Sequence, residues 1–173
     1  MAVLDFSEEF PVVNERGEII GKASRRECHS GSKLLHPVVH LHVFDAAGNL
    51  FLQKRSLKKD IQPGRWDTSV GGHVDYGETI NDALVRETCE ELGLNVVNPI
   101  KLYDYIFESG IERELVNTFK CVARAEDITV DEDEISEGRF FSFEEIESLL
   151  GSGKLTPNFE IEYSKLKRAL KLR

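Results

Sequence analysis

Three glutamates, Glu87, Glu90 and Glu91, have the i, i+3, i+4 spacing that brings side chains together on one face of a helix. Like charges held so close repel each other, and the repulsion grows where water is partly excluded, so a cation has to offset them. Arg86 can balance one carboxylate but not all of them. Mg²⁺ and Mn²⁺ prefer clustered carboxylate oxygens. These residues therefore indicate a site for a divalent cation.

The helix that must position these carboxylates is bounded by clear signals in the stretch GGHVDYGETINDALVRETCEELGL at 71–94. Thr79 suits the N-cap of a helix, and Gly93 suits the position just after its last turn. Projected at about 100° per residue, the glutamates continue the apolar stripe that begins at Ile80 and Leu84. A solvated acidic face is the alternative interpretation, and helix periodicity alone leaves both open.

The rest of the chain alternates between predicted strands and predicted helices. Residues 12–21 and 42–52 each have two apolar runs around a polar turn that ends in glycine, which predicts β-hairpins. Further strands are predicted at 37–45, 49–55, 67–74, 100–108, 113–125 and 134–143, a loop at 56–66, and helices at 143–153 and 158–171. This order favours an α/β or α+β layered architecture with helices packed on a mixed sheet.

Length and composition fit one domain. The chain has 173 residues, of which 40% are hydrophobic, and no Pro/Ser-rich linker divides it. We expect a single domain over 1–173 with an N-terminal β-hairpin extension at about 9–24 and a C-terminal helix at about 157–172. The net charge of −9 disfavours nucleic acid as a partner, and no signal peptide or membrane span is evident, so we expect a cytoplasmic protein.

The glutamate stretch resembles the motif of the Nudix hydrolases, G-x5-E-x7-R-E-U-x-E-E-x-G-U, where U is a bulky apolar residue. The matching residues are Gly72, Glu78, Arg86, Glu87, Glu90, Glu91, Gly93 and Leu94, and Thr88 departs from the first U. The resemblance implies an α/β/α sandwich around a mixed β-sheet. It also implies that Glu87, Glu90 and Glu91 bind Mg²⁺ or Mn²⁺ on a diphosphate that water then splits, and that Arg86 holds a glutamate in place.

Residues from about 12 to 150 also resemble isopentenyl-diphosphate isomerase and the hydrolases related to it, notably in PGRWDTSVGGHVDYGE. In that enzyme, histidines and a Glu-x-Glu pair hold a metal ion. The residues at matching places here are His29, His36, His73, Glu112 and Glu114. Such a set suits Zn²⁺, Mn²⁺ or Mg²⁺. Exposed loop histidines and the outer face of a hairpin are the alternative. His40 and His42 share one face of their strand and are interpreted as structural or as lining a pocket.

Two departures from the isomerase indicate hydrolysis. The isomerase needs a cysteine to move a proton at carbon, and this chain has Gly71 at that place. The glutamates that the isomerase has largely lost from the motif are all present here. We therefore expect a hydrolase of a diphosphate bond in a nucleoside diphosphate-linked or related small compound. Isomerase activity, and a binding module that senses a nucleotide or metabolite without turnover, are the alternatives.

A basic cluster follows the strand at 49–55 and contains Lys54, Arg55, Lys58 and Lys59. Arg55 and Lys59 resemble the diphosphate-binding positions of the isomerase, and a bidentate arginine suits phosphate oxygens. A solvated strand end is the alternative. Trp66, the only tryptophan, is a candidate for stacking on a substrate, although core packing is the more common role of a lone large aromatic. The substrate itself and the oligomeric state, with a homodimer as one option, stay open.

Overall fold

The computed structural model describes residues 8–172, which form nine strands and four α-helices. The strands are β1 (Glu9–Val13), β2 (Ile19–Ser24), β3 (Leu35–Phe44), β4 (Leu50–Arg55), β5 (Trp66–Asp67), β6 (Val70–His73), β7 (Ile100–Glu108), β8 (Arg113–Val122) and β9 (Ile135–Phe141). The helices are α1 (Arg25–Cys28), α2 (Ile80–Leu92), α3 (Phe143–Leu149) and α4 (Pro157–Ala169), and a 3₁₀ turn, η1, covers Ala125–Asp127.

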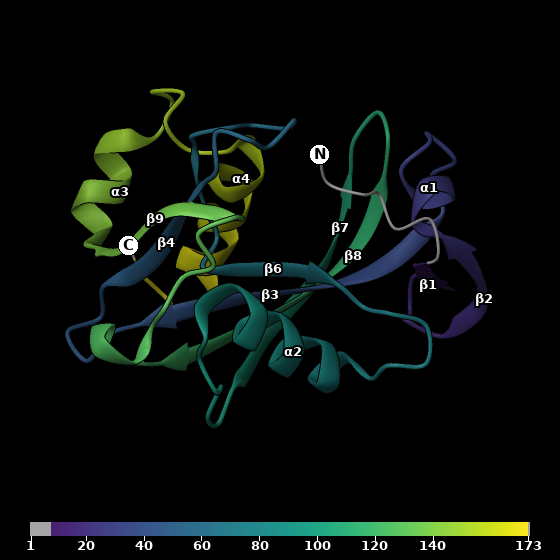
Figure 1. The fold of residues 1–173 in the computed structure, drawn as a ribbon, viewed down its shortest axis with the longest axis horizontal. Helices are drawn as coiled ribbons and strands as arrows, with labels where there is room; N and C mark the ends of the chain where they lie inside the picture. Colours follow the sequence, from purple (N-terminus) through teal and green to yellow (C-terminus); the bar gives the residue numbers. More distant parts are fainter. Residues whose placement is uncertain (1–7, 173) are drawn as a thin grey trace.

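Seven strands form one mixed sheet with the order β5-β4-β3-β8-β7, in which β6 also pairs with β3 and β9 with β4. The pairing of β3 with β8 is parallel over the full length of both strands, and the other pairings are antiparallel. The remaining two strands, β1 and β2, form a separate hairpin at one end of the sheet, beside α1 (Figure 1). The sheet therefore joins segments that lie far apart in the sequence.

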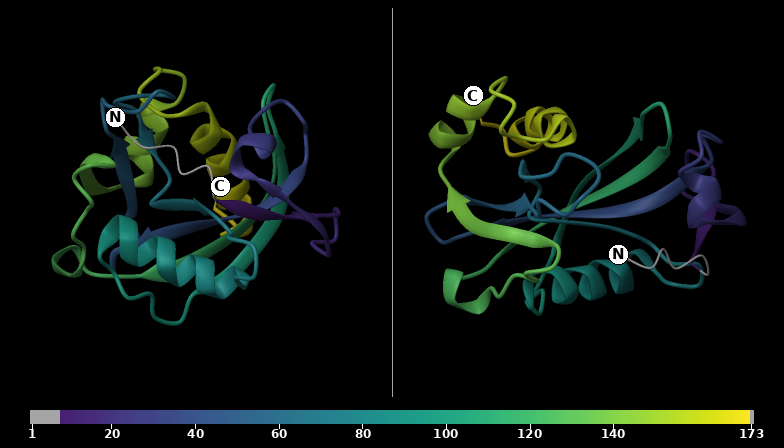
Figure 2. Two further views of the ribbon diagram at one scale, coloured as in Figure 1. Left: turned by 45° about the vertical axis from the view of Figure 1, so that its right-hand side comes forward. Right: turned by 45° about the horizontal axis from the view of Figure 1, so that its top comes forward.

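Helices cover both faces of the sheet (Figures 1 and 2). Apolar residues of α2 pack with Val39, Leu41 and Val43 of β3 in one buried cluster. On the opposite face, α3 and α4 bury residues such as Phe159 and Leu166 against β4 and β9. The expected α/β/α sandwich is confirmed, and its two cores arise because side chains alternate between the faces of each strand.

The alternation along β3 decides where its histidines point. Val39, Leu41 and Val43 belong to the cluster under α2. His40 and His42 therefore face the other side, where both contact α4. The predicted shared face of the two histidines is thus the face toward the C-terminal helix.

Local capping sets the ends of the two long helices. α2 begins after Thr79, whose side chain accepts the amide hydrogen of Asp82, and it ends at Gly93 in the left-handed region with φ 58°. α4 stops at Ala169, short of the expected end at about 172, because Lys171 adopts a positive φ of 56°. Neither of these helices, nor another in residues 8–172, is long and apolar enough to cross a membrane.

Candidate metal centre

The carboxylates of α2 face the sheet at the end of β6. Glu91 accepts hydrogen bonds from the Gln53 side-chain amide at 3.0 Å and from the Gly71 backbone amide at 3.2 Å. Glu87 lies against the backbone of Gly72, while the side chain of Glu90 is 59% exposed. The three glutamates therefore differ in burial. The alternative interpretation of the helix as a solvated acidic face fits only Glu90.

Arg86 joins the helix to the loop that precedes it. Its guanidinium donates to both carboxylate oxygens of Glu78 at 2.8 and 3.0 Å and to Glu87 at 2.9 Å. A further bond reaches the backbone carbonyl of His73 at 3.0 Å, and Glu90 accepts at 3.4 Å. Arg86 thus fixes Glu87 in orientation, and its charge offsets only part of the negative charge around it.

Burial opposes the ionisation of the two inner carboxylates. It raises the pKa of Glu91 to about 8, with the nearby charge of Glu87 acting in the same direction. It also raises the pKa of Glu87, although Arg86 partly counters the effect. Two carboxylates that resist ionisation side by side are stabilised in their charged form by a cation between them. This arrangement suits a divalent ion.

Gly72 leaves room for Glu87. A β-carbon placed on Gly72 would lie 2.1 Å from the side-chain Cδ of Glu87. We therefore expect Gly72→Ala to displace that carboxylate from Arg86 and to lower kcat/KM at least about tenfold, since misplacing a reacting or ligating group carries such costs. Steady-state kinetics with a hydrolysed diphosphate would measure the loss. Gly21→Ala is the control, because a β-carbon there meets no atom within 4 Å; equal activity of both variants would contradict the steric argument.

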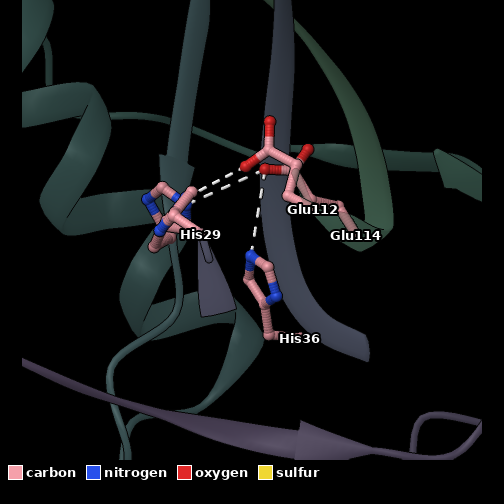
Figure 3. A group of neighbouring side chains, drawn as sticks. His29, His36, Glu112 and Glu114 are labelled. Carbon is pink, nitrogen blue, oxygen red and sulfur yellow. Dashed lines mark ion pairs between the residues drawn. The ribbon is translucent and has the colours of Figure 1, made fainter. Parts of the chain in front are cut away.

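A second cluster of metal-ligand side chains lies at the other end of β6. One potential ligand atom from each of five residues lies within 4.8 Å of all the others, and the residues are His29, His36, His73, Glu112 and Glu114. The Nε2–H group of His29 donates to the Glu112 carboxylate at 2.9 Å. Figure 3 shows His29 and His36 directed toward the two glutamates. The five residues that the isomerase resemblance singled out thus come together in space.

Two imidazole nitrogens in this cluster are buried without a hydrogen-bond partner, Nε2 of His36 and Nε2 of His73. Both point at the same oxygen of Glu114, at 4.0 and 3.8 Å, too far for a hydrogen bond. Burial lowers the pKa of both histidines, so both rings are neutral near pH 7 and able to ligate. Orphaned nitrogens facing a carboxylate fit a bound transition-metal ion.

The pKa values of the two carboxylates in this cluster are shifted in opposite directions. The hydrogen bond with His29 lowers the pKa of Glu112. Burial, together with the charge of Glu112, raises the pKa of Glu114. His29 in turn has a raised pKa because of its bond to Glu112. A cation bound between them would relieve the burial of charge at Glu114, as at Glu91.

Phe10 of the N-terminal hairpin is a residue of this site that sequence reasoning missed. Its ring stacks on His73 at 4.6 Å between centroids and on His36 at 5.7 Å. Phe10 is fully buried, so it closes one side of the cluster to water. A hairpin far from the glutamate motif in sequence therefore forms a wall of the centre, and no local pattern marks it.

One cavity of about 620 Å³ joins the two clusters. Its lining includes Glu87, Glu90, Glu91, Glu112, Glu114, His73, His40, Arg55 and Lys59. Arg55 is held by the Ile61 carbonyl and lies 3.5 Å from Asp67, and Lys59 forms a close ion pair with Glu134. The cavity therefore brings residues of two candidate cation sites together with the basic side chains of Arg55 and Lys59.

Trp66 is not among the residues that line this cavity, contrary to its selection as a substrate contact. Its ring packs edge-on against Phe141 at 4.8 Å and lies under Lys54 and Arg139. Trp66 contributes to the core under α3 and α4. Phe141, Lys54 and Arg139 already pack around this ring, and so the core interpretation fits better.

Glu162 of α4 is a second residue that sequence reasoning missed. Its side chain is 1% exposed and forms hydrogen bonds with His40 Nδ1 at 2.5 Å and with His42 Nε2 at 3.1 Å. The hydroxyls of Thr118 and Tyr105 donate to it at 3.2 and 3.1 Å. The predicted C-terminal helix therefore does more than pack on the domain, since it holds the strand histidines through one buried carboxylate.

The stability that Glu162 contributes should depend on pH. The charge of His40 and its hydrogen bond outweigh burial and lower the pKa of Glu162, so its contribution is present above about 4.5 and lost in stronger acid. The pKa of His40 rises to about 9, so the stability that its charge contributes is fully present below pH 6.5 and is lost as pH rises through 9. The nearby negative charges of Glu114 and Asp67 also raise the pKa of His40.

We therefore expect Glu162→Gln to lower the free energy of unfolding by about 2 kcal/mol, the scale of a hydrogen bond between charged groups. The difference from the natural protein should be largest between pH 4.5 and 6.5 and should shrink toward pH 9 or above. Urea unfolding at pH 5.5 and pH 9.5 would measure it. A difference that is constant with pH would contradict an ion pair at this position.

Comparison with known proteins gives a consistent result. The family model described as NUDIX domain matches residues 34–159. The chain is 35% identical over 154 residues to an uncharacterized Nudix hydrolase of Listeria monocytogenes, covering 88% of this chain and 90% of that protein. It is 30% identical over 134 residues to the isopentenyl-diphosphate Delta-isomerase of Shigella flexneri, covering 75% of this chain and 74% of the isomerase. Its fold is similar to DR0079 of Deinococcus radiodurans, with a TM-score of 0.78 and 24% identity over 91% of this chain and 98% of that one.

Proposed function

Because the chain belongs to the Nudix family of hydrolases, which act on pyrophosphate bonds, we propose that it cleaves the diphosphate bond of a small diphosphate compound with Mg²⁺ or Mn²⁺ as cofactor. The observation that carries this proposal is one cavity whose lining includes the carboxylates of α2, three members of the His/Glu cluster (His73, Glu112 and Glu114), and the basic side chains of Arg55 and Lys59. An acid-rich cavity binds an anionic substrate only with cations between them. The basic side chains of Arg55 and Lys59 suit the phosphate oxygens that remain.

In this proposal, each group of residues in the site has a separate role. Glu87, Glu90 and Glu91 would hold one or more divalent ions, and the His/Glu cluster would hold another. Bound ions of this kind neutralise developing phosphoryl charge and acidify water. Arg55 and Lys59 would orient the diphosphate, and Arg86 would hold Glu87 in place. Burial makes the carboxylate of Glu91 a stronger proton acceptor than an exposed one, which suits a general base for the attacking water.

Isomerase activity is the second candidate, since some relatives carry that name. Two observations speak against it. Gly71 stands in place of the cysteine, and the edge of the His40 ring lies 3.3 Å from where a β-carbon on Gly71 would be. None of the cysteines within residues 8–172 lines the cavity; Cys28 and Cys121 are buried elsewhere and Cys89 is exposed. Conversion of isopentenyl diphosphate to dimethylallyl diphosphate, followed by ¹H NMR, would reverse this choice.

The deciding experiment is a substrate panel with Mg²⁺ or Mn²⁺, read by ³¹P NMR in water enriched in ¹⁸O. Nucleoside diphosphates, dinucleotides, sugar nucleotides and prenyl diphosphates cover the main classes. The position of the isotope in the products reports which phosphorus is attacked. Cleavage of at least one compound supports the proposal. Tight binding without product over hours would instead indicate a sensor of metabolites, and no binding at all would contradict both.

A further inference from the structure

The buried carboxylate of Glu162 requires a positive partner. A buried ionised carboxylate without one costs several kcal/mol. Within residues 8–172, no lysine or arginine forms an ion pair with Glu162, and the two histidines are the groups in contact with it that can carry charge. His40 makes the shorter contact, at 2.5 Å against 3.1 Å for His42. His40 is therefore the cation of this pair.

The opposite edge of the His40 ring is turned toward the cavity. His40 is 17% exposed at its side chain and lines the cavity, whereas His42 is fully buried and does not. The Nε2 atom of His40 lies 3.4 Å from where a β-carbon on Gly71 would be. The amide of Gly71 donates to Glu91. With Nδ1 engaged by Glu162, the ring presents Nε2–H beside the backbone that holds the inner glutamate.

We propose that His40 contacts the substrate, donating a hydrogen bond from Nε2–H to a phosphoryl oxygen, and that Glu162 is the positioning residue that fixes the orientation and the charge of its ring. This role rests on the proposed hydrolysis of a diphosphate in the same cavity. No bond to His40 forms or breaks. Its positive charge offsets phosphoryl charge in a cavity where acidic side chains outnumber basic ones.

The placement of Glu162 on α4 supports this role. Asn158 lies four residues earlier on the same helix, and it also lines the cavity. Two residues on one face of α4 are thus close to the cavity. Asn158 lines it directly, and Glu162 binds His40, which also lines it. Burial alone would lower the pKa of His40, but the charge of Glu162 outweighs it and raises that pKa to about 9. The nearby negative charges of Glu114 on β8 and Asp67 on β5 also raise the pKa of His40.

Kinetics of three variants would separate a substrate contact from a purely structural network. We expect His40→Gln to lower kcat/KM roughly 10- to 100-fold, the range for a hydrogen bond to a charged group. Glu162→Gln should also lower kcat/KM. It should move the alkaline limb of the pH–rate profile to lower pH, because the charge of Glu162 raises the pKa of His40. Tyr105→Phe is the matched control, because it removes another donor to the same Glu162 oxygen while leaving His40 in place. It should stay within about threefold of the natural enzyme.

Two kinetic outcomes would overturn the proposal while the proposed function stands. One is a His40→Gln variant within about threefold of the natural enzyme, when Glu91→Gln is inactive. The other is a Tyr105→Phe variant that loses as much activity as His40→Gln, since that would assign the loss to the fold of the network. Urea unfolding of each variant would accompany the kinetics.

A spectroscopic arm tests His40 even if no substrate is cleaved. In protein labelled with ¹⁵N-histidine, the ring nitrogens of His40 should have the chemical shifts of an imidazolium at pH 7, assigned by comparison with His40→Gln. Adding methylenediphosphonate with Mg²⁺ should shift the Nε2 signal and leave His42 unchanged. A neutral ring at pH 7, or an Nε2 signal unmoved by saturating diphosphonate, would overturn the proposal. An imidazolium that responds, combined with an inactive enzyme, would reject only the hydrolytic function.

Discussion

Glu91→Gln is expected to reduce kcat by at least about 10²-fold at saturating Mg²⁺ or Mn²⁺, the usual scale for removing a proton acceptor or a metal ligand. Glu91 is the inner carboxylate of α2, and glutamine preserves its volume while removing its charge and its basicity. The variant should also show a smaller rise in Tm on adding Mg²⁺, since an ion that binds only the folded state stabilises it less when it binds more weakly. Steady-state kinetics and thermal unfolding would measure the two effects.

The same substitution has an opposite effect on the metal-free protein. Burial raises the pKa of Glu91 from its usual 4.5 to about 8. The natural protein therefore loses stability as pH rises from 4.5 through 8, because the fold then has to hold an ionised buried carboxylate. Glutamine removes this loss, so the Tm difference in favour of the variant should grow over that interval and level off above pH 8.

Glu144→Gln is the matched control for Glu91→Gln, because Glu144 is exposed on α3 and does not line the cavity. It should retain the kcat and the metal response of the natural protein. Full activity of Glu91→Gln would contradict the proposed chemistry at α2. A folded but inactive Glu91→Gln variant with an undiminished metal response would restrict the role of Glu91 to proton transfer.

Glu114→Gln is expected to weaken binding of Mn²⁺ or Zn²⁺ to the His/Glu cluster by about 10²-fold or more. Glu114 is the carboxylate that both orphaned imidazole nitrogens face, so its loss removes the anion at the centre of the ligand set. Imidazole nitrogens suit Zn²⁺ and carboxylate oxygens suit Mn²⁺, and the affinity of such a set depends on the number and charge of its ligands. Equilibrium dialysis with metal analysis by mass spectrometry would count the ions lost per chain.

Glu108→Gln provides the control for Glu114→Gln. Glu108 belongs to the same hairpin, but its side chain is 53% exposed and pairs with Lys33. It should leave metal binding unchanged. If the natural protein binds ions that Glu91→Gln removes and Glu114→Gln does not affect, the His/Glu cluster is not a metal site. If Glu114→Gln removes one ion per chain and Glu91→Gln another, the cavity holds two independent sites.

Much of the fold followed from local signals. The limits of α2 came from a threonine cap and a closing glycine, and both act within one turn of the helix. The i, i+3, i+4 spacing of its three glutamates needed no knowledge of the rest of the chain. Strand β7 was likewise predicted with its observed bounds, because runs of apolar and aromatic residues between turn signals are local patterns too.

The candidate site depended more on pairing between distant segments. The parallel pairing of β3 with β8 places His36 opposite Glu114, and the antiparallel pairing of β3 with β6 brings His73 beside them. A resemblance to the isomerase suggested these residues as a group, but periodicity by itself could not. Which strands pair depends on how the whole chain buries its apolar surface, and no short window of sequence contains that information.

The sequence by itself determined the carboxylate helix, the alternation of strands and helices, and the absence of a cysteine at Gly71, since each is a property of neighbouring residues. Only the tertiary structure decided that Phe10 covers the imidazoles, that Trp66 turns into the core, and that Glu162 reaches His40 and His42. These contacts join residues separated by much of the chain. Their free energy comes from burial that exists only once the sheet and both helical layers have assembled.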